Sequence, residues 1–112
     1  MPKKAEALGE FEQLVLLAIA HQGEDAYGVT IRGEIVRRTG RNVAIGALYT
    51  ALDRLERKGF VSSSMSDPTP ERGGRSRRYY ALRAAGAAAL RQSRDRLARM
   101  WAGLEVNLRG RG

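Results

Sequence analysis

The chain has 112 residues, which suits one domain with a single modest core. Its 20 Lys and Arg outnumber 12 Asp and Glu, for a net charge of +8; because the positive charge concentrates in residues 72–83 and 91–99, it favours a polyanionic partner over a plain solvated surface. The absence of cysteine excludes disulfides and thiolate zinc sites, and no segment resembles a signal peptide or a membrane span, so we expect a soluble cytoplasmic protein.

Two helices are predicted at the start of the chain. The first runs from about Gly9 to His21, and its apolar face is broad enough for burial on more than one side. That face comprises Phe11, Leu14, Val15, Leu16, Leu17, Ala18 and Ile19. After a turn at residues 22–25, a second helix is predicted over 27–39, and Gly40 ends it. Its apolar residues are Val29, Ile31, Ile35 and Val36, and its polar residues include Arg32, Glu34, Arg37 and Arg38.

The third predicted helix, which ends at Gly59, has the clearest amphipathic pattern. Leu48, Leu52 and Leu55 recur at spacings of four and three residues, and Ala51 widens the stripe. Gly59 follows two basic residues, where a left-handed cap is expected. The other positions are polar or small, so this helix has one face to bury and one to display. Three short helices joined by short turns predict a helix-turn-helix arrangement.

Two β-prone runs follow, at residues 60–65 and 77–82. Residues 66–76 between them contain prolines, adjacent glycines and arginines, which predicts a β-hairpin with a long basic tip, or wing. A flexible linker to the last helix is the alternative. On an alternating strand one tyrosine faces inward, and we expect Tyr80 to join the core.

The last predicted helix covers residues 84–107. Its apolar positions form a short coiled-coil-like seam, with Trp101 and Leu108 beside it. The seam comprises Leu90, Ser93, Leu97, Met100 and Leu104. We expect this stripe to meet a second copy of the helix, the first helix of its own chain, or both. The predicted dimer interface is Leu90, Leu97, Met100, Trp101, Leu104 and Leu108.

These elements predict an α+β, mostly α fold: a winged helix-turn-helix with a three-helix core and a hairpin wing, followed by a long C-terminal helix. Residues 1–83 would form the DNA-binding domain and residues 84–108 the dimerisation helix. Residues 109–112, Arg-Gly-Arg-Gly, have no packing pattern and are expected to be disordered.

Three segments resemble the PadR family of bacterial transcriptional regulators. They are Tyr27-Gly28, residues 45–59, and residues 72–80 with the sequence Arg-Gly-Gly-Arg-Ser-Arg-Arg-Tyr-Tyr. Their order and spacing are more specific than any one of them. The short chain with one C-terminal helix resembles the smaller branch of the family, which implies a winged helix-turn-helix dimer held by that helix. Ala44 departs from the family pattern, in which a serine commonly caps the third helix, and Asn42 is a candidate for that role.

The residues themselves suggest how the chain would bind double-stranded DNA. Small residues at the start of the third helix let the backbone approach the major groove, and polar ones farther along can donate to phosphates or bases. Arginines around two glycines in the wing would lie against the sugar-phosphate backbone. The predicted DNA-binding residues are Tyr27, Asn42, Ala44, Gly46, Ala47, Tyr49, Thr50, Arg54, Arg72, Gly73, Gly74, Arg75 and Arg77. Asp53, Glu56, Arg57 and Lys58 are assigned to ordinary surface, solubility and capping.

Trp101 suggests a second site. An aromatic residue on a dimerising helix is ordinarily an interface anchor. In the branch that this chain resembles, however, one repressor stacks flat aromatic drugs between paired tryptophans. A pocket for a small hydrophobic or aromatic effector is therefore a hypothesis. Its lining would be Phe11, Val15, Leu97, Met100 and Trp101.

The sequence does not support an enzyme. Its serines have no partner base, one histidine cannot build a triad, and Gly73-Gly74-Arg75 lacks the context of a phosphate-cradling loop. We expect no cofactor and no metal. The predicted function is a dimeric, sequence-specific repressor that binds a palindromic operator. The alternative is a basic RNA- or ribosome-associated structural module without sequence preference.

Overall fold

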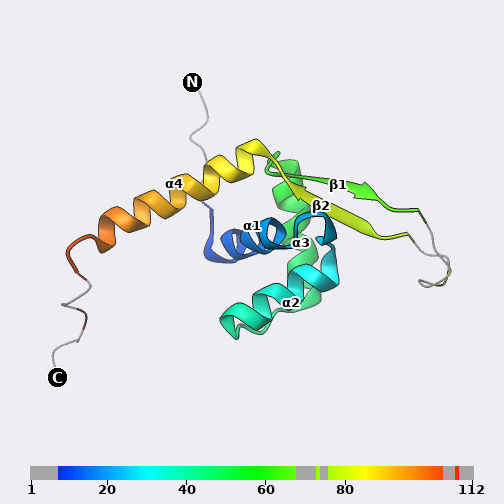
Figure 1. The fold of residues 1–112 in the computed structure, drawn as a ribbon, viewed down its shortest axis with the longest axis horizontal. Helices are drawn as coiled ribbons and strands as arrows, with labels where there is room; N and C mark the ends of the chain where they lie inside the picture. Colours follow the sequence, from blue (N-terminus) through cyan, green and yellow to red (C-terminus); the bar gives the residue numbers. More distant parts are fainter. Residues whose placement is uncertain (1–7, 68–72, 74–75, 105–107, 109–112) are drawn as a thin grey trace.

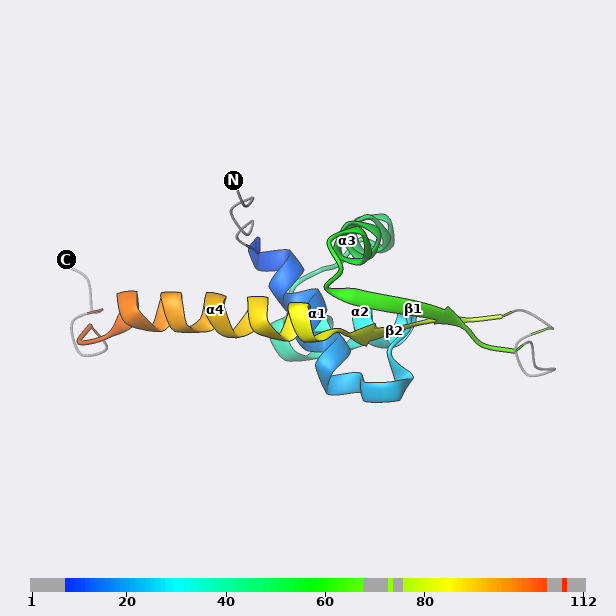
Figure 2. The same cartoon turned by 90° about the horizontal axis from the view of Figure 1, so that it is seen from above.

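The computed structural model describes residues 8–67, 73, 76–104 and 108. Its elements, in chain order, are α1 (Glu10–Gln22), the 3-10 turn η1 (Gly23–Asp25), α2 (Gly28–Thr39), α3 (Ile45–Arg57), β1 (Val61–Met65), β2 (Arg78–Leu82) and α4 (Ala84–Trp101). Helices α1 to α3 form the body, and the hairpin and α4 extend from it in opposite directions (Figure 1). The view from above shows α3 standing to one side of the line that α4 and the hairpin make (Figure 2). The predicted winged helix-turn-helix fold is confirmed.

The ends of α1, α2 and α3 follow local sequence signals. Glu12 accepts a hydrogen bond from the Gly9 backbone N–H at 3.1 Å, which caps the start of α1. At the end of α3, Gly59 has φ +79° and donates to the Glu56 carbonyl. Phe60 then donates to the Leu55 carbonyl, and the two bonds together make a Schellman motif. The left-handed cap predicted at Gly59 is therefore present.

The core lies where α1, α2 and α3 meet, next to the hairpin. The four apolar stripe residues of α3, Leu48, Ala51, Leu52 and Leu55, have no exposed surface. Leu16 on α1 is also fully buried, whereas Leu17 remains 45% exposed. The prediction that α1 is buried on more than one side therefore holds for Leu16 and is wrong for Leu17 within one chain. The apolar arc of α1 is wider than the surface that the rest of the described chain covers.

The two strands pair antiparallel, with Val61 opposite Leu82 and Ser63 opposite Tyr80. This confirms the hairpin over a flexible linker. Tyr80 is 4% exposed and belongs to the core, as predicted. Its backbone N–H donates to the Ala26 carbonyl at 2.8 Å, so the residue before α2 extends the sheet beyond β2. The predicted tip, residues 66–76, lies mostly outside the described residues.

Helix α4 starts against the root of the hairpin. Gly86 is its one fully buried residue, and a Cβ atom there would collide with the Phe60 carbonyl oxygen. The Phe60 carbonyl also accepts a hydrogen bond from Arg83 at 2.9 Å. The helix ends at Trp101 and not near residue 107, because Gly103 turns the chain with φ +83°. None of the described helices has the length and hydropathy needed to span a membrane.

Candidate nucleic-acid interface

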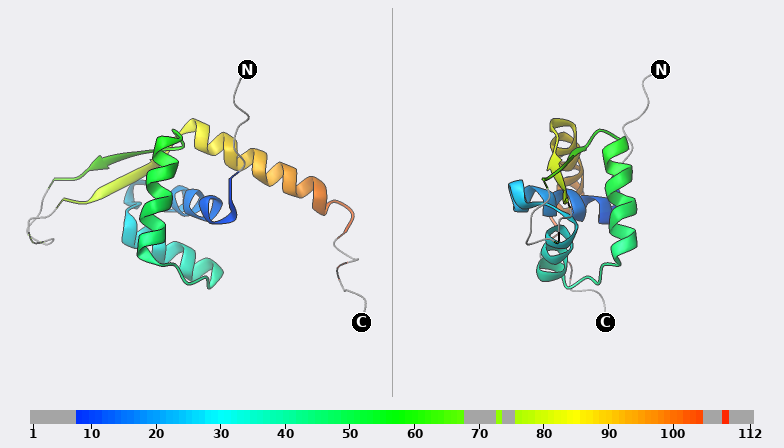
Figure 3. Two further views of the ribbon diagram at one scale, coloured as in Figure 1. Left: turned by 180° about the vertical axis from the view of Figure 1, so that it is seen from behind. Right: turned by 90° about the vertical axis from the view of Figure 1, so that its right-hand side faces the viewer.

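The outer face of α3 is open to solvent. Burial of its apolar stripe leaves four residues on the opposite side, all exposed: Gly46, Thr50, Asp53 and Arg57. The end-on view shows α3 along one edge of the molecule, with no other described helix or strand over its outer side (Figure 3, right). Ala44 and Ala47 at its leading end are also exposed. A helix of this shape can enter a DNA major groove, because the outer side of its first turn carries the small residues Gly46 and Ala47.

Arg57 shares the outer face of α3 with the predicted DNA-binding residues. The sequence analysis assigns it to solubility, and the structure places it, exposed, on the same helical face as Gly46, Thr50 and Asp53. The spacings of four, three and four residues along this face repeat those of the buried stripe. That periodicity could have identified Arg57 from the sequence.

Tyr49 lies on the side of α3 that meets the start of α2. Its hydroxyl packs over Gly28, where any Cβ atom would collide with it, and its Cζ atom would lie 3.0 Å from that Cβ. Glycine at this position therefore permits the contact. The structure thus places the predicted DNA-binding residue Tyr49 against Gly28, the neighbour of Tyr27, and this contact directs Tyr49 to the flank of α3 and not to its outer face.

Arg54 lies on the other flank of α3, facing α1. Its Nε donates to Glu12 Oε2 at 3.0 Å, and Lys58 Nζ lies 3.2 Å from the same oxygen. Burial raises the pKa of Glu12, but hydrogen bonds from Arg54, the Gly9 amide and Lys58 outweigh it and lower the pKa below its usual value. The sequence interpretation missed Glu12 altogether. A carboxylate on the otherwise apolar face of α1 was the signal that could have revealed it.

The root of the wing is attached to the start of α2. The Arg77 guanidinium lies 4.3 Å from the centre of the Tyr27 ring. The Tyr27 and Tyr79 rings pack edge to face, with centroids 5.4 Å apart, and the two residues also form a β-bridge. Two predicted DNA-binding residues, Tyr27 and Arg77, are therefore in direct contact.

The other predicted DNA-binding residues lie either in exposed loops or at positions that the structure does not describe. Gly73 is exposed with φ +62°, whereas Arg72, Gly74 and Arg75 lie outside the described residues. Asn42 is exposed in the loop before α3. The N-cap of α3 is Ala44, without a side-chain hydrogen bond, so Asn42 lies two positions too early to cap the helix.

A second carboxylate is buried at the far end of α2. Glu34, one of the polar residues of the predicted second helix, is 4% exposed and accepts hydrogen bonds from Arg37 at 2.7 Å and from Arg38 and Gln22. The bond from Arg38 is the main cause of its lowered pKa. These partners compensate the burial of a charge on the side of α2 that faces α1.

The five predicted effector residues do not surround one cavity in the described chain. Val15 has no exposed surface, and Phe11 is half-buried beneath Arg41, whose guanidinium lies 5.0 Å from the ring centre. The other three are exposed on α4: Leu97, Met100 and Trp101.

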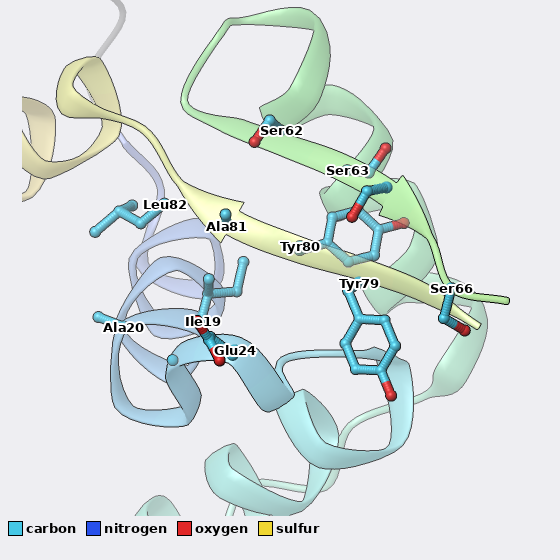
Figure 4. Close-up of a pocket in the computed structure, with 12 residues that line it drawn as sticks. Ile19, Ala20, Glu24, Ser62, Ser63, Ser66, Tyr79, Tyr80, Ala81 and Leu82 are labelled. Carbon is cyan, nitrogen blue, oxygen red and sulfur yellow. The ribbon is translucent and has the colours of Figure 1, made fainter.

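A groove of about 760 Å³ lies elsewhere, between the end of α1 and the hairpin (Figure 4). Its lining includes Ile19, Leu82 and Tyr79, together with the hydroxyls of the serine run in β1. No sequence pattern indicated this groove.

Comparison with known proteins identifies the family. Residues 16–92 match the model of the transcriptional regulator PadR-like family. A search of curated protein sequences gives no match. Among solved structures, a PadR family transcription regulator from Clostridium difficile R20291 superposes with a TM-score of 0.70 at 24% identity, over 89% of this chain and 99% of that one.

Two further structures agree. A PadR-like transcriptional regulator from Bacillus cereus strain ATCC 14579 gives a TM-score of 0.71 at 20% identity, over 90% of this chain and 93% of that one. A PadR family regulator from Eggerthella lenta DSM 2243 gives 0.68 at 23% identity, over 91% and 88%. The family match covers more than half of the chain, and the winged helix-turn-helix fold, with the exposed outer face of α3 and the hairpin, agrees with it. The chain belongs to the PadR-like family of transcriptional regulators.

Proposed function

We propose that this protein is a sequence-specific DNA-binding repressor that acts in the cytoplasm. Helix α3 enters the major groove with its outer face, Gly46, Thr50 and Arg57 foremost, and the wing lies on the neighbouring backbone. The observation that carries this proposal is the uncovered outer face of α3 with small residues at its leading end. Backbone contacts fix the position of the protein, and the side chains of α3 select the bases.

The protein acts as a homodimer held by α4. Leu97, Met100 and Trp101 are between 46% and 74% exposed, and Leu104 and Leu108 beyond the end of α4 are exposed as well. An apolar stripe on a helix that projects from the body is suited to bury itself against a second copy. Two-fold symmetry then predicts a palindromic operator with half-sites about 10 bp apart, centre to centre.

A small hydrophobic or aromatic effector binds near Trp101 in this dimer and releases the DNA. Trp101 is 46% exposed in one chain, so a stacked ligand would have access to its ring. Because Trp101 is the single tryptophan, its fluorescence reports on this site alone. Planar cationic dyes should quench it. An unchanged emission at saturating dye would rule out the pocket.

Selection of bound fragments from genomic DNA of the source organism tests the main proposal. The full chain should enrich a palindromic sequence, and a labelled duplex of that sequence should stay bound in the presence of excess random-sequence DNA or RNA. Equal displacement by random DNA and by RNA would instead support the RNA- or ribosome-associated module, because phosphate contacts alone do not discriminate among sequences.

A further inference from the structure

The boundary between α1 and α3 holds a buried carboxylate that belongs to neither the core nor the exposed face of α3. Glu12 is 7% exposed, and both of its oxygens are engaged. Oε1 accepts the Gly9 N–H at 3.1 Å, and Oε2 meets Arg54 Nε at 3.0 Å and Lys58 Nζ at 3.2 Å. The cap of α1 therefore fixes the orientation of the carboxylate, which in turn fixes one edge of the Arg54 guanidinium.

The remaining edge of Arg54 is directed to solvent. Its side chain is 46% exposed, although Nε is bonded to a carboxylate that is almost completely buried. A guanidinium has five N–H donors in a rigid plane, so this bond leaves the four N–H groups of the two Nη atoms for another acceptor. Within the described part of the chain, Glu12 is the one partner of Arg54.

Glu12 meets two cations at this boundary, Arg54 and Lys58. The nearest acid along α1, Glu10, pairs with Arg41 instead, at 3.4 Å. The exposed part of the Arg54 guanidinium lies at the flank of α3, beside the face proposed to enter the major groove. A DNA phosphate has the charge and the paired oxygen acceptors to bind there.

We propose that Glu12 is a positioning residue for DNA binding, which holds the Arg54 guanidinium so that its Nη groups meet a backbone phosphate at the rim of the major groove. The inference rests on the proposed function, because it requires α3 to be the DNA-binding helix. It makes Arg54 a residue for affinity and register, and not for the choice of bases.

The direction in which Glu12→Gln changes DNA affinity separates this positioning role from simple charge neutralisation. Glu12→Gln makes the protein more positive, which by itself strengthens binding to any polyanion. If Glu12 orients Arg54, the same substitution weakens binding. Glu10→Gln is the matched control, because it removes the same charge from the same helix turn without touching α3.

The experiment titrates the full chain into a fluorescein-labelled mixed-sequence duplex of roughly 30 bp, between about 50 and 200 mM KCl. Arg54→Ala should weaken binding about tenfold and reduce the salt slope by about 0.9. Glu12→Gln should weaken it about threefold to tenfold, and Glu10→Gln should leave it equal or tighter. In the Arg54→Ala background, Glu12→Gln should have no further weakening effect.

Arg54→Lys extends the test while Glu12 remains in place. An ammonium bound to Glu12 lacks the second edge of a guanidinium, so Arg54→Lys should bind DNA as weakly as Arg54→Ala. Thermal melting of each variant separates loss of folding from loss of binding.

The outcomes separate this inference from the function on which it rests. Tighter binding by Glu12→Gln, or a Glu12→Gln defect that persists without Arg54, would overturn the positioning role while DNA binding stands. Wild-type affinity in Arg54→Lys would overturn it as well. A wild-type protein that does not bind the duplex at all would overturn the proposed function and this inference together.

Discussion

Helices α3 and α4 both carry an apolar stripe, but only α3 completes its packing within the chain. The stripe of α3 is fully buried, and ion pairs and a tyrosine contact hold both of its flanks. Along α4 only Gly86 is buried, and exposure rises toward the far end, where Met100 is 74% exposed. Helix α3 is held in place by its own chain, whereas the apolar stripe of α4 stays exposed in the described chain and, in the proposed dimer, is covered by a second copy.

The largest expected effect is on the packing of α3. Leu52→Ala removes a fully buried side chain and should lower the free energy of unfolding by roughly 2–5 kcal/mol. Denaturant unfolding of the full chain measures the loss. The matched control is Leu97→Ala, which is 59% exposed and should change the stability of one chain by less than about 0.5 kcal/mol. Equal losses for the two variants would break the contrast between the helices.

The second prediction concerns assembly. Leu97→Asp places a charge in the proposed α4 interface and should weaken the dimer at least tenfold, since an unpaired charge is costly to bury. Sedimentation velocity across protein concentrations would reveal this shift. Arg91→Asp, on an exposed part of the same helix away from the predicted seam, serves as control and should stay dimeric. A dimer that withstands Leu97→Asp would place the interface elsewhere.

The third prediction tests whether the wing depends on the α2 contact. Arg77→Ala removes the guanidinium beside the Tyr27 ring, a cation–π contact of about 0.5–1 kcal/mol. DNA affinity should fall about threefold to tenfold for all sequences alike, with a salt slope smaller by about 0.9. Fluorescence anisotropy titrations with a specific duplex and with a random duplex measure this loss of affinity for each sequence. A loss confined to the specific duplex would instead make Arg77 a base-reading residue.

The smallest expected effect is pH-dependent. The pKa of Glu12 is lowered in the folded protein, so its stabilising contribution is present above the unfolded value near 4.5 and is lost as pH falls through the folded value. Glu12→Gln should therefore reduce the drop in Tm between pH 7 and about pH 3. Asp95→Asn, which alters the exposed Arg94–Asp95 pair on α4, should leave that drop unchanged. An unchanged drop in Glu12→Gln would mean that other carboxylates govern acid unfolding.

The sequence predicted those features that depend on residues close together in the chain. The spacing of Leu48, Leu52 and Leu55 identified the buried face of α3, and Gly59 identified its end. Alternation in β2 placed Tyr80 inside. Each of these signals involves residues close together in the chain, and the packing of the rest of the chain kept the burial and the helix end that each signal predicted.

The features that the sequence interpretation missed depend on partners far apart in the chain. A carboxylate on the apolar face of α1, Glu12, could be noticed locally, but its partner Arg54 lies 42 residues away and could not be predicted from it. The contact of Tyr49 with Gly28 of another helix likewise has no local signal. Periodicity shows which side of a helix is polar, whereas the neighbouring helices determine which polar residues stay available to a ligand.

In the proposed dimer, Gly86 would link the geometry of one chain to the spacing of the operator half-sites. No side chain fits between α4 and the Phe60 carbonyl, so this glycine determines the angle at which the helix leaves the body. Eighteen residues of helix form a lever of about 27 Å, and a tilt of roughly 10° at its root moves the far end by about 5 Å. In the proposed dimer, one added methyl group would change the distance between two α3 helices without altering either. Half-site spacing and base recognition can therefore evolve independently.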